Sequence, residues 1–183
     1  MRRGFKAEAE RLAARVRNDA GIDEHAVLDI SMLVSHLGAT LRSADELTSL
    51  AKLEELELIQ PGAFSACTFD LGSRIIIVAS PLASPERRRS DVSHEAAHLI
   101  LRHSVKDVEQ LGGLSFFTCD PDEEQEATWL AGCLLLPRAL LLRSLRRGMN
   151  AEAIAAANEV SPQMANFRLR TTGVQRQLAA RSW

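Results

Sequence analysis

The chain has 183 residues, of which 46% are hydrophobic and 25% charged, and its formal net charge is −2. This length corresponds to about one domain and is enough to bury a sizeable core. No run of 18 or more apolar residues occurs, which excludes a continuous membrane-spanning helix, and we expect no membrane partner.

The first half of the chain predicts helices around a short sheet. In chain order, the predicted elements are a helix over 7–20, a helix over 26–37, a short strand over 39–43, an ambiguous leucine-rich stretch over 47–58 that could be a helix, and strands over 63–69 and 74–79. Gly21 and Gly38 follow the first two helices and supply the left-handed residue that ends many helices. Residues 70–73, Asp-Leu-Gly-Ser, have the turn chemistry of a β-hairpin.

Helix-start signals are prominent in the second half. Ser84-Pro85-Glu86 combines a hydroxyl cap, a proline at the first helical position and an acidic first turn, and Asp120-Pro121-Asp122-Glu123 repeats this pattern. The predicted helices cover 84–103, 120–136, 137–148, 151–158 and 162–171, and Gly173 closes the last of them. We therefore expect one α+β domain over residues 1–183, mostly helical, with a small antiparallel sheet or β-hairpin.

The strongest functional signal is the segment His94-Glu95-Ala96-Ala97-His98. Residues four apart lie on one side of a helix, about 40° apart around its axis, so His94 and His98 can hold one metal ion together. Glu95 then lies where its carboxylate can meet a metal-bound water. This is the HExxH pattern of zinc-dependent peptide hydrolysis, with the glutamate as general base. A chance HExxH in a chain of this composition has odds of roughly 1 in 100, so the neighbouring sequence must decide.

A catalytic zinc site needs three protein ligands and one position open to water. His103 would face nearly the opposite side of a continuous helix from His94, so we expect it to cap the helix end or to pack. His25 and His36 are expected to be structural or solvated. The acidic residues 120–126 mostly resemble the usual negative first turn of a helix. Glu126 differs, because it heads an apolar stripe, where a carboxylate is costly without a partner such as a metal ion.

These motifs resemble those of the ImmA/IrrE family of metallopeptidases. There, HExxH is followed by a second motif, E-x-E-A-N-x-F-A-x-x-L-L-x-P, which residues 124–137 resemble. The resemblance implies a zincin-like HExxH helix and assigns the third ligand to the glutamate before the alanine, Glu126. Three further matches extend the resemblance over nearly the whole chain: Glu86-Arg87-Arg88-Arg89 to E-R-x-R, Val160-Ser161 with Arg168-Leu169 and Gly173 to V-S…R-L…G, and the hairpin over 63–79.

Some positions depart from the family pattern. The departures are Ser90 and Asp91 in place of phenylalanine and threonine, Ala97 in place of glycine, Thr128 in place of asparagine, and Leu130 in place of phenylalanine. None of them removes a ligand or the base. They alter the surroundings of the ligands, and contacts that orient ligands can change metal affinity by about 10–100-fold.

The resemblance implies one Zn²⁺ per chain, held by His94, His98 and Glu126, although two imidazoles and a carboxylate suit several divalent metals. Zinc would lower the pKa of a bound water and polarise the peptide carbonyl, and Glu95 would pass the proton from the attacking water to the leaving amine. The chain has no tyrosine, and we nominate no residue to stabilise the oxyanion. An edge strand such as 74–79 could align an extended substrate through its backbone.

Members of this family act as anti-repressors, which cut a helix-turn-helix transcriptional repressor in response to damage or to mobile-element signals. The resemblance implies the same for this chain, with the repressor supplied in trans. We expect a cytoplasmic protein, because residues 1–6 lead into a charged amphipathic pattern and not into the apolar core of a signal peptide. Three cysteines, Cys67, Cys119 and Cys133, without a CxxC pair indicate a reducing compartment and argue against a thiolate zinc site.

Two other functions stay open. Residues 155–170 have a helix-turn-helix pattern, and residues 138–183 hold eight arginines and two glutamates, so the C-terminal helices over 151–173 could bind DNA. Only Arg168 and Arg170 lie on the would-be recognition helix, however, and a basic helical face is often simply solvated. Alternatively, the chain keeps the fold without catalysis and acts as a zinc-stabilised protein-interaction module.

Overall fold

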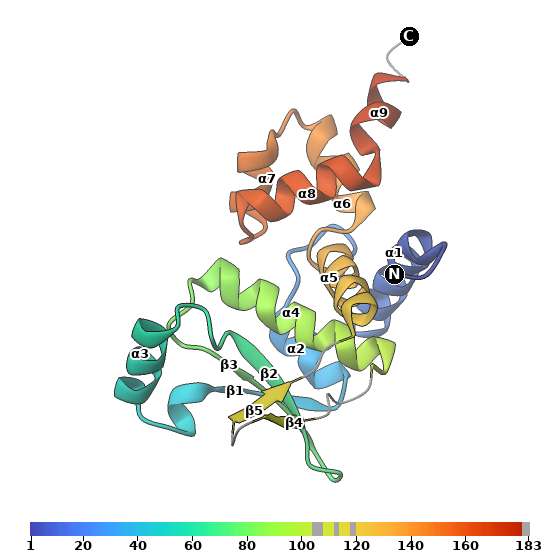
Figure 1. Cartoon of the computed structure of the whole chain (residues 1–183). Coiled ribbons are helices and arrows are strands. Elements are labelled where there is room, and N and C mark those ends of the chain that lie inside the picture. The colour runs from blue at the N-terminus through green and yellow to red at the C-terminus, as the bar shows by residue number, and fades with distance from the viewer. Residues whose placement is uncertain (104–107, 112–113, 118–119, 181–183) are drawn as a thin grey trace.

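Helix α4, which carries the HExxH segment, lies between a small sheet and the helices of the main core (Figure 1). The computed structural model describes residues 1–103, 108–111, 114–117 and 120–180. The elements in chain order are α1 (Phe5–Asp19), α2 (Ile30–His36), β1 (Ala39–Ser43), the 3₁₀-helix η1 (Ala44–Glu46), α3 (Leu50–Ile59), β2 (Ala66–Asp70), β3 (Ile75–Ala79), α4 (Pro85–Leu101), β4 (Val108–Leu111), β5 (Leu114–Phe117), α5 (Pro121–Leu135), α6 (Arg138–Arg146), α7 (Ala151–Ala157), α8 (Pro162–Thr172) and α9 (Val174–Ala179).

The sheet confirms the α+β class and the predicted hairpin. Its strand order is β1-β3-β2, with β2 antiparallel to β3 and β1 parallel to β3. The sheet is therefore mixed and not purely antiparallel, because β1 pairs in parallel with the edge of β3 that β2 leaves free. The suggestion that residues 74–79 form an edge strand is wrong, because β3 is paired on both sides. Its uninterrupted apolar sequence, with Ile77 fully buried, is typical of a central strand.

Most predicted helices are present. Some of their ends are shifted, and at α2 the capping residue determines where the helix begins. Helix α2 begins at Ile30 and not at residue 26, because the Asp29 side chain accepts a hydrogen bond from the Met32 N–H and caps the helix there. Helix α4 begins as predicted, with Ser84 as its cap, and ends at Leu101. The short helix α9 continues beyond Gly173, where the sequence predicts an end.

Helix α5 is the centre of the main core. Its residues from Glu126 to Leu135 are buried except Thr128, and α1, α4 and α8 pack around it. A Cβ atom on Gly132 would lie 3.0 Å from the Arg168 side chain, so the absence of a side chain there lets α8 approach α5 closely. In Figure 1, helices α6–α9 gather at the end of the molecule opposite the sheet.

The C-terminal end of α5 depends on two fully buried arginines. Arg17 of α1 donates 2.7 Å hydrogen bonds to the carbonyls of Leu134, Asp23 and Ala26. Burial lowers the pKa of Arg17 to about 10, so the side chain still carries its charge at neutral pH. Arg168 of α8 donates to the Leu136 carbonyl at 3.0 Å. Both guanidinium groups thus satisfy carbonyls at a helix end, where a positive charge is favoured.

Among the described residues, no single helix is both long and apolar enough to cross a membrane. In the described part of the chain, one pair of helices, α5 and α6, reaches that length and composition together, and the pair is bent by 46°.

Replacing Arg17 with methionine should destabilise the fold. The substitution removes the donor to the buried Leu134 carbonyl and the side-chain donor to the carbonyls of Asp23 and Ala26, so we expect a loss of about 2–4 kcal/mol in the free energy of unfolding, measured by urea denaturation. Arg15→Met is the matched control, because Arg15 is exposed on the same helix. Equal stabilities of the two variants would contradict this role of Arg17.

Candidate metal centre

Helix α4 places its functional residues on the side that faces α5 and the sheet. The Ser84 side chain accepts from the Arg87 N–H, and Pro85 occupies the first turn, so the helix start is fixed ten residues before His94. Ala96 and Ala97 are fully buried on this helix, as is Ala127 on α5. These small side chains allow the two helices to pack closely, and α5 presents its first turn to the histidines.

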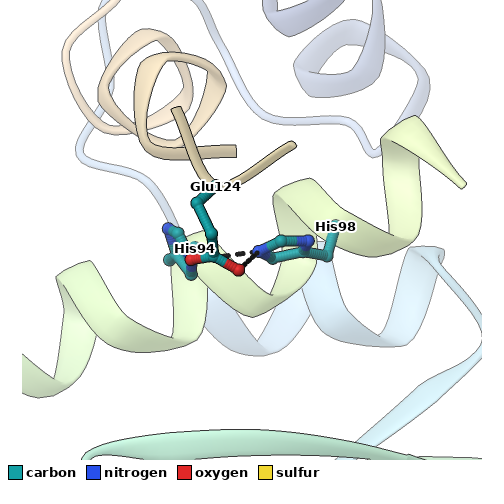
Figure 2. Close-up of side chains that lie close together, drawn as sticks. All are labelled: His94, His98 and Glu124. Atoms are coloured by element: carbon teal, nitrogen blue, oxygen red, sulfur yellow. Dashed lines mark hydrogen bonds and ion pairs between the residues drawn. The ribbon is translucent and has the colours of Figure 1, made fainter. Parts of the chain in front are cut away.

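The imidazoles of His94 and His98 converge on the carboxylate of Glu124 (Figure 2). The two Nε2 atoms are 3.0 Å apart. Oxygen atoms of Glu124 lie 3.2 Å from His94 Nε2 and 3.4 Å from His98 Nε2. The three side chains are partly exposed, so the cluster is accessible from solvent.

This donor set fits a zinc ion. In a tetrahedral site with ligand bonds of about 2.0–2.1 Å, neighbouring ligand atoms are about 3.3 Å apart. The observed separations of 3.0–3.4 Å match that spacing. Two imidazoles and one carboxylate are also a ligand combination of catalytic zinc sites, which keep one position open.

Glu126, the third ligand suggested by the family motif, does not join the cluster in this structure. Its carboxylate is 4% exposed and accepts hydrogen bonds from the backbone N–H and from Nε of Arg2, at 2.8 and 3.0 Å. Burial raises the pKa of Glu126, but the hydrogen bonds from Arg2 outweigh burial and hold this pKa below its usual range. The carboxylate brought to His94 and His98 is that of Glu124, two residues earlier.

The other nitrogen atoms of the two imidazoles also have partners. Thr128 Oγ lies 3.4 Å from His94 Nδ1, so the threonine at the family's asparagine position faces a candidate ligand. His103 Nδ1 lies 3.0 Å from His98 Nδ1. The sequence does not predict the contact with His103, because its pattern indicates a continuous helix, whereas α4 ends at Leu101 and Arg102 adopts a left-handed conformation with φ 54°.

Glu95, the predicted base, lies on the face of α4 that meets strand β2. The Thr68 hydroxyl donates a 2.7 Å hydrogen bond to one oxygen of its carboxylate. No sequence signal singled out Thr68, because the contact joins residues from two elements that only the fold brings together. Cys67 lies beside Thr68, and burial, with a smaller effect of Glu95, raises the pKa of its thiol to about 11. This thiol is therefore protonated at neutral pH.

A cleft of about 1020 Å³ opens beside His94. One wall is the N-terminal half of α4, from Ser84 to His94, and the opposite side is formed by α7, α8 and the turn between them. Thr128 and Ala131 of α5 also line it. A polypeptide bound in this cleft would therefore pass directly by the candidate metal centre.

The C-terminal helices have the expected pattern, but one of the two arginines on α8, the would-be recognition helix, is not at the surface. Arg168 is fully buried and pairs with Glu10 of α1 at 2.7 Å, in addition to the Leu136 carbonyl. Of the two arginines on α8, only Arg170 is exposed. Residues of the α7–α8 turn also line the cleft. These positions favour a packing role for α7 and α8 over a role in reading DNA.

Comparison with known families identifies the class of protein. Residues 60–170, more than half of the chain, match the model of the peptidase M78 family, described as the IrrE N-terminal-like domain. The chain therefore belongs to this family, which confirms the resemblance seen in the sequence. A search of curated proteins finds no match. The family supports a metallopeptidase and a protein substrate.

Exchanging each of the two glutamates in turn should show which one binds the metal. We expect Glu124→Gln to weaken zinc binding by more than about 100-fold, since even residues that only orient ligands contribute about 10–100-fold. Glu126→Gln should keep one zinc per chain within about tenfold of wild-type affinity. Metal analysis and competition with a chromogenic chelator measure both. The opposite order of affinities would restore Glu126 as the ligand.

Proposed function

We propose that the protein is a zinc-dependent endopeptidase in which His94, His98 and Glu124 hold one Zn²⁺ and Glu95 is the general base. The observation that carries this proposal is the convergence of both HExxH histidines on a carboxylate at zinc-like spacing. Bound there, zinc would polarise a peptide carbonyl and make a water molecule more acidic. Other divalent metals suit the same ligands.

The residues around Glu95 support its role as base. Glu95 accepts the proton of the attacking water and afterwards delivers it to the leaving amine. The hydrogen bond from Thr68 holds one of its oxygens and leaves the other to meet the water. Thr68 is thus a positioning residue for the base. It also ties α4 to β2, which is an outer strand of the three-stranded sheet.

We further propose a narrow substrate range, with a helix-turn-helix repressor supplied in trans as substrate, so that the protein acts as an anti-repressor. This part rests on the family and on the position of the candidate metal centre at a cleft between helices. We also propose that residues 1–183 act as one peptidase domain, since α1 and α9, outside the matched segment, pack on α5 and α6. A cytoplasmic location agrees with the free thiols of Cys67 and Cys133.

Replacing the base tests catalysis separately from metal binding. Glu95→Gln should lower the rate of repressor cleavage by about 10²–10⁴-fold, because proton transfer is lost. Its zinc content should be unchanged, because Glu95 is not among the proposed ligands. Co-expression with candidate helix-turn-helix repressors, followed by immunoblotting for fragments, measures cleavage.

Glu54→Gln, on the exposed face of α3, is the control and should cleave like wild type. Equal repressor survival with wild type and Glu95→Gln, in the presence of bound zinc, would favour the non-catalytic interaction module instead.

A further inference from the structure

The cleft beside His94 has walls of different chemistry. Its α4 side carries Glu86, Arg87 and Asp91, and its opposite side carries Glu152 of α7. Arg87 is the one cation among the described lining residues, and it is already paired with Asp91 at 2.9 Å. The lining therefore holds uncompensated negative charge from Glu86 and Glu152.

The α5 and α8 side of the cleft carries its large apolar side chains. Ala131, Met164 and Phe167 line it, together with Val160 of the turn before α8. Phe167 packs edge-to-face on Trp129 with ring centroids 5.4 Å apart, which holds its ring in place. An apolar side chain of a bound peptide would find its partners on this side.

The distance along α4 from His94 to Glu86 indicates how far from the scissile bond a side chain next to Glu86 would lie. Glu86 precedes His94 by eight residues on α4, which corresponds to about 12 Å along the helix. An extended peptide covers about 3.3 Å per residue. A side chain three or four residues from the scissile bond would therefore reach Glu86.

We infer that this cleft binds an extended substrate segment that has an apolar residue near the scissile bond and a basic residue three or four positions away, next to Glu86. The inference rests on the proposed peptidase function and names the chemistry of its substrate. It also gives α7 and α8 a role as the far wall of the substrate site.

Two measurements separate the inference from the proposed function. Internally quenched ten-residue peptides with a central leucine, and with lysine or glutamate four positions away on either side, test cleavage by the zinc-loaded wild type. The same peptides, labelled with fluorescein, test binding to zinc-loaded Glu95→Gln by fluorescence anisotropy. Absence of cleavage would count against the proposed function. The binding measurement alone tests whether the cleft prefers peptides with a basic residue.

We expect the lysine peptides to bind about tenfold or more tightly than the glutamate peptides, and Glu86→Lys combined with Glu152→Lys to reverse this preference. Glu54→Lys, outside the cleft, is the matched control and should leave the preference unchanged. Equal binding of the two peptides, binding of neither, or a preference unaffected by the double charge reversal would overturn the inference.

The contact between His98 and His103 carries a second, independent inference. Arg102, in its left-handed conformation, turns the chain back so that the His103 N–H donates to the His98 carbonyl at 3.1 Å. This is the hydrogen bond of a Schellman motif. The two imidazoles then meet edge to face, with Nδ1 atoms 3.0 Å apart.

The geometry assigns His103 as a positioning residue for the metal ligand His98. A ring nitrogen that binds a metal carries no proton, so a neutral His98 that binds through Nε2 has its proton on Nδ1. Nδ1 of His98 then donates to Nδ1 of His103. This hydrogen bond fixes both the tautomer and the ring orientation of His98.

Two replacements of His103 distinguish hydrogen bonding from packing. Asparagine places an acceptor oxygen near the position of Nδ1, whereas phenylalanine keeps the ring and removes the acceptor. We expect His103→Phe to weaken Zn²⁺ binding by about 10–100-fold and His103→Asn to stay within a few-fold of wild type. Chelator competition measures affinity, and the visible spectrum of the Co²⁺ form reports ligand geometry.

His36→Phe, at an exposed site on α2, is the control, and thermal unfolding without metal checks that each variant folds. Wild-type zinc affinity in a folded His103→Phe variant, or an equal loss in the asparagine and phenylalanine variants, would overturn the assignment.

Discussion

The close packing of α4 on α5 is the constraint on which the candidate site depends. The histidines and the carboxylate belong to different helices, and their donor atoms can reach one another only if the helix axes approach closely. Fully buried alanines, Ala96 and Ala97 on one helix and Ala127 on the other, permit this approach. The family's glycine at position 97 is thus replaced by the next smallest residue. A larger side chain at any of these positions would move Glu124 away from the histidines.

The sequence predicts the two helices well because their starts are encoded locally. A hydroxyl or carboxylate cap followed by proline marks the start of each, and the structure has Ser84 and Asp120 as the caps. No local signal of this kind shows which carboxylate lies beside His94 and His98. Glu126 heads the buried stripe of α5, and burial suggested a metal as its partner, but an arginine 124 residues away fills that role. Glu124, by contrast, is partly exposed and lies beside His94 and His98.

Contacts between separate elements could not be predicted from local sequence patterns either. His103 contacts His98 because Arg102 takes a left-handed conformation without being glycine, so no composition signal marks the turn. Thr68 reaches Glu95 through the pairing of β2 beside α4. The position of β3 in the middle of the sheet follows from its parallel pairing with β1, which is remote in the chain. Local patterns predict elements, whereas these contacts depend on how the elements meet.

The capping of α5 by two arginines has a consequence for the boundaries of the domain. Arg17 of α1 and Arg168 of α8, far apart in the sequence, satisfy two carbonyl groups at the end of one helix, those of Leu134 and Leu136. Arg17 lies outside the segment over 60–170 that matches the family model. A fragment cut to that segment would bury the Leu134 carbonyl without a donor or expose the helix end to water. We therefore expect residues 60–170 alone to be less stable than the whole chain, because Arg17 binds the end of the helix that carries Glu124 from more than one hundred positions away in the sequence.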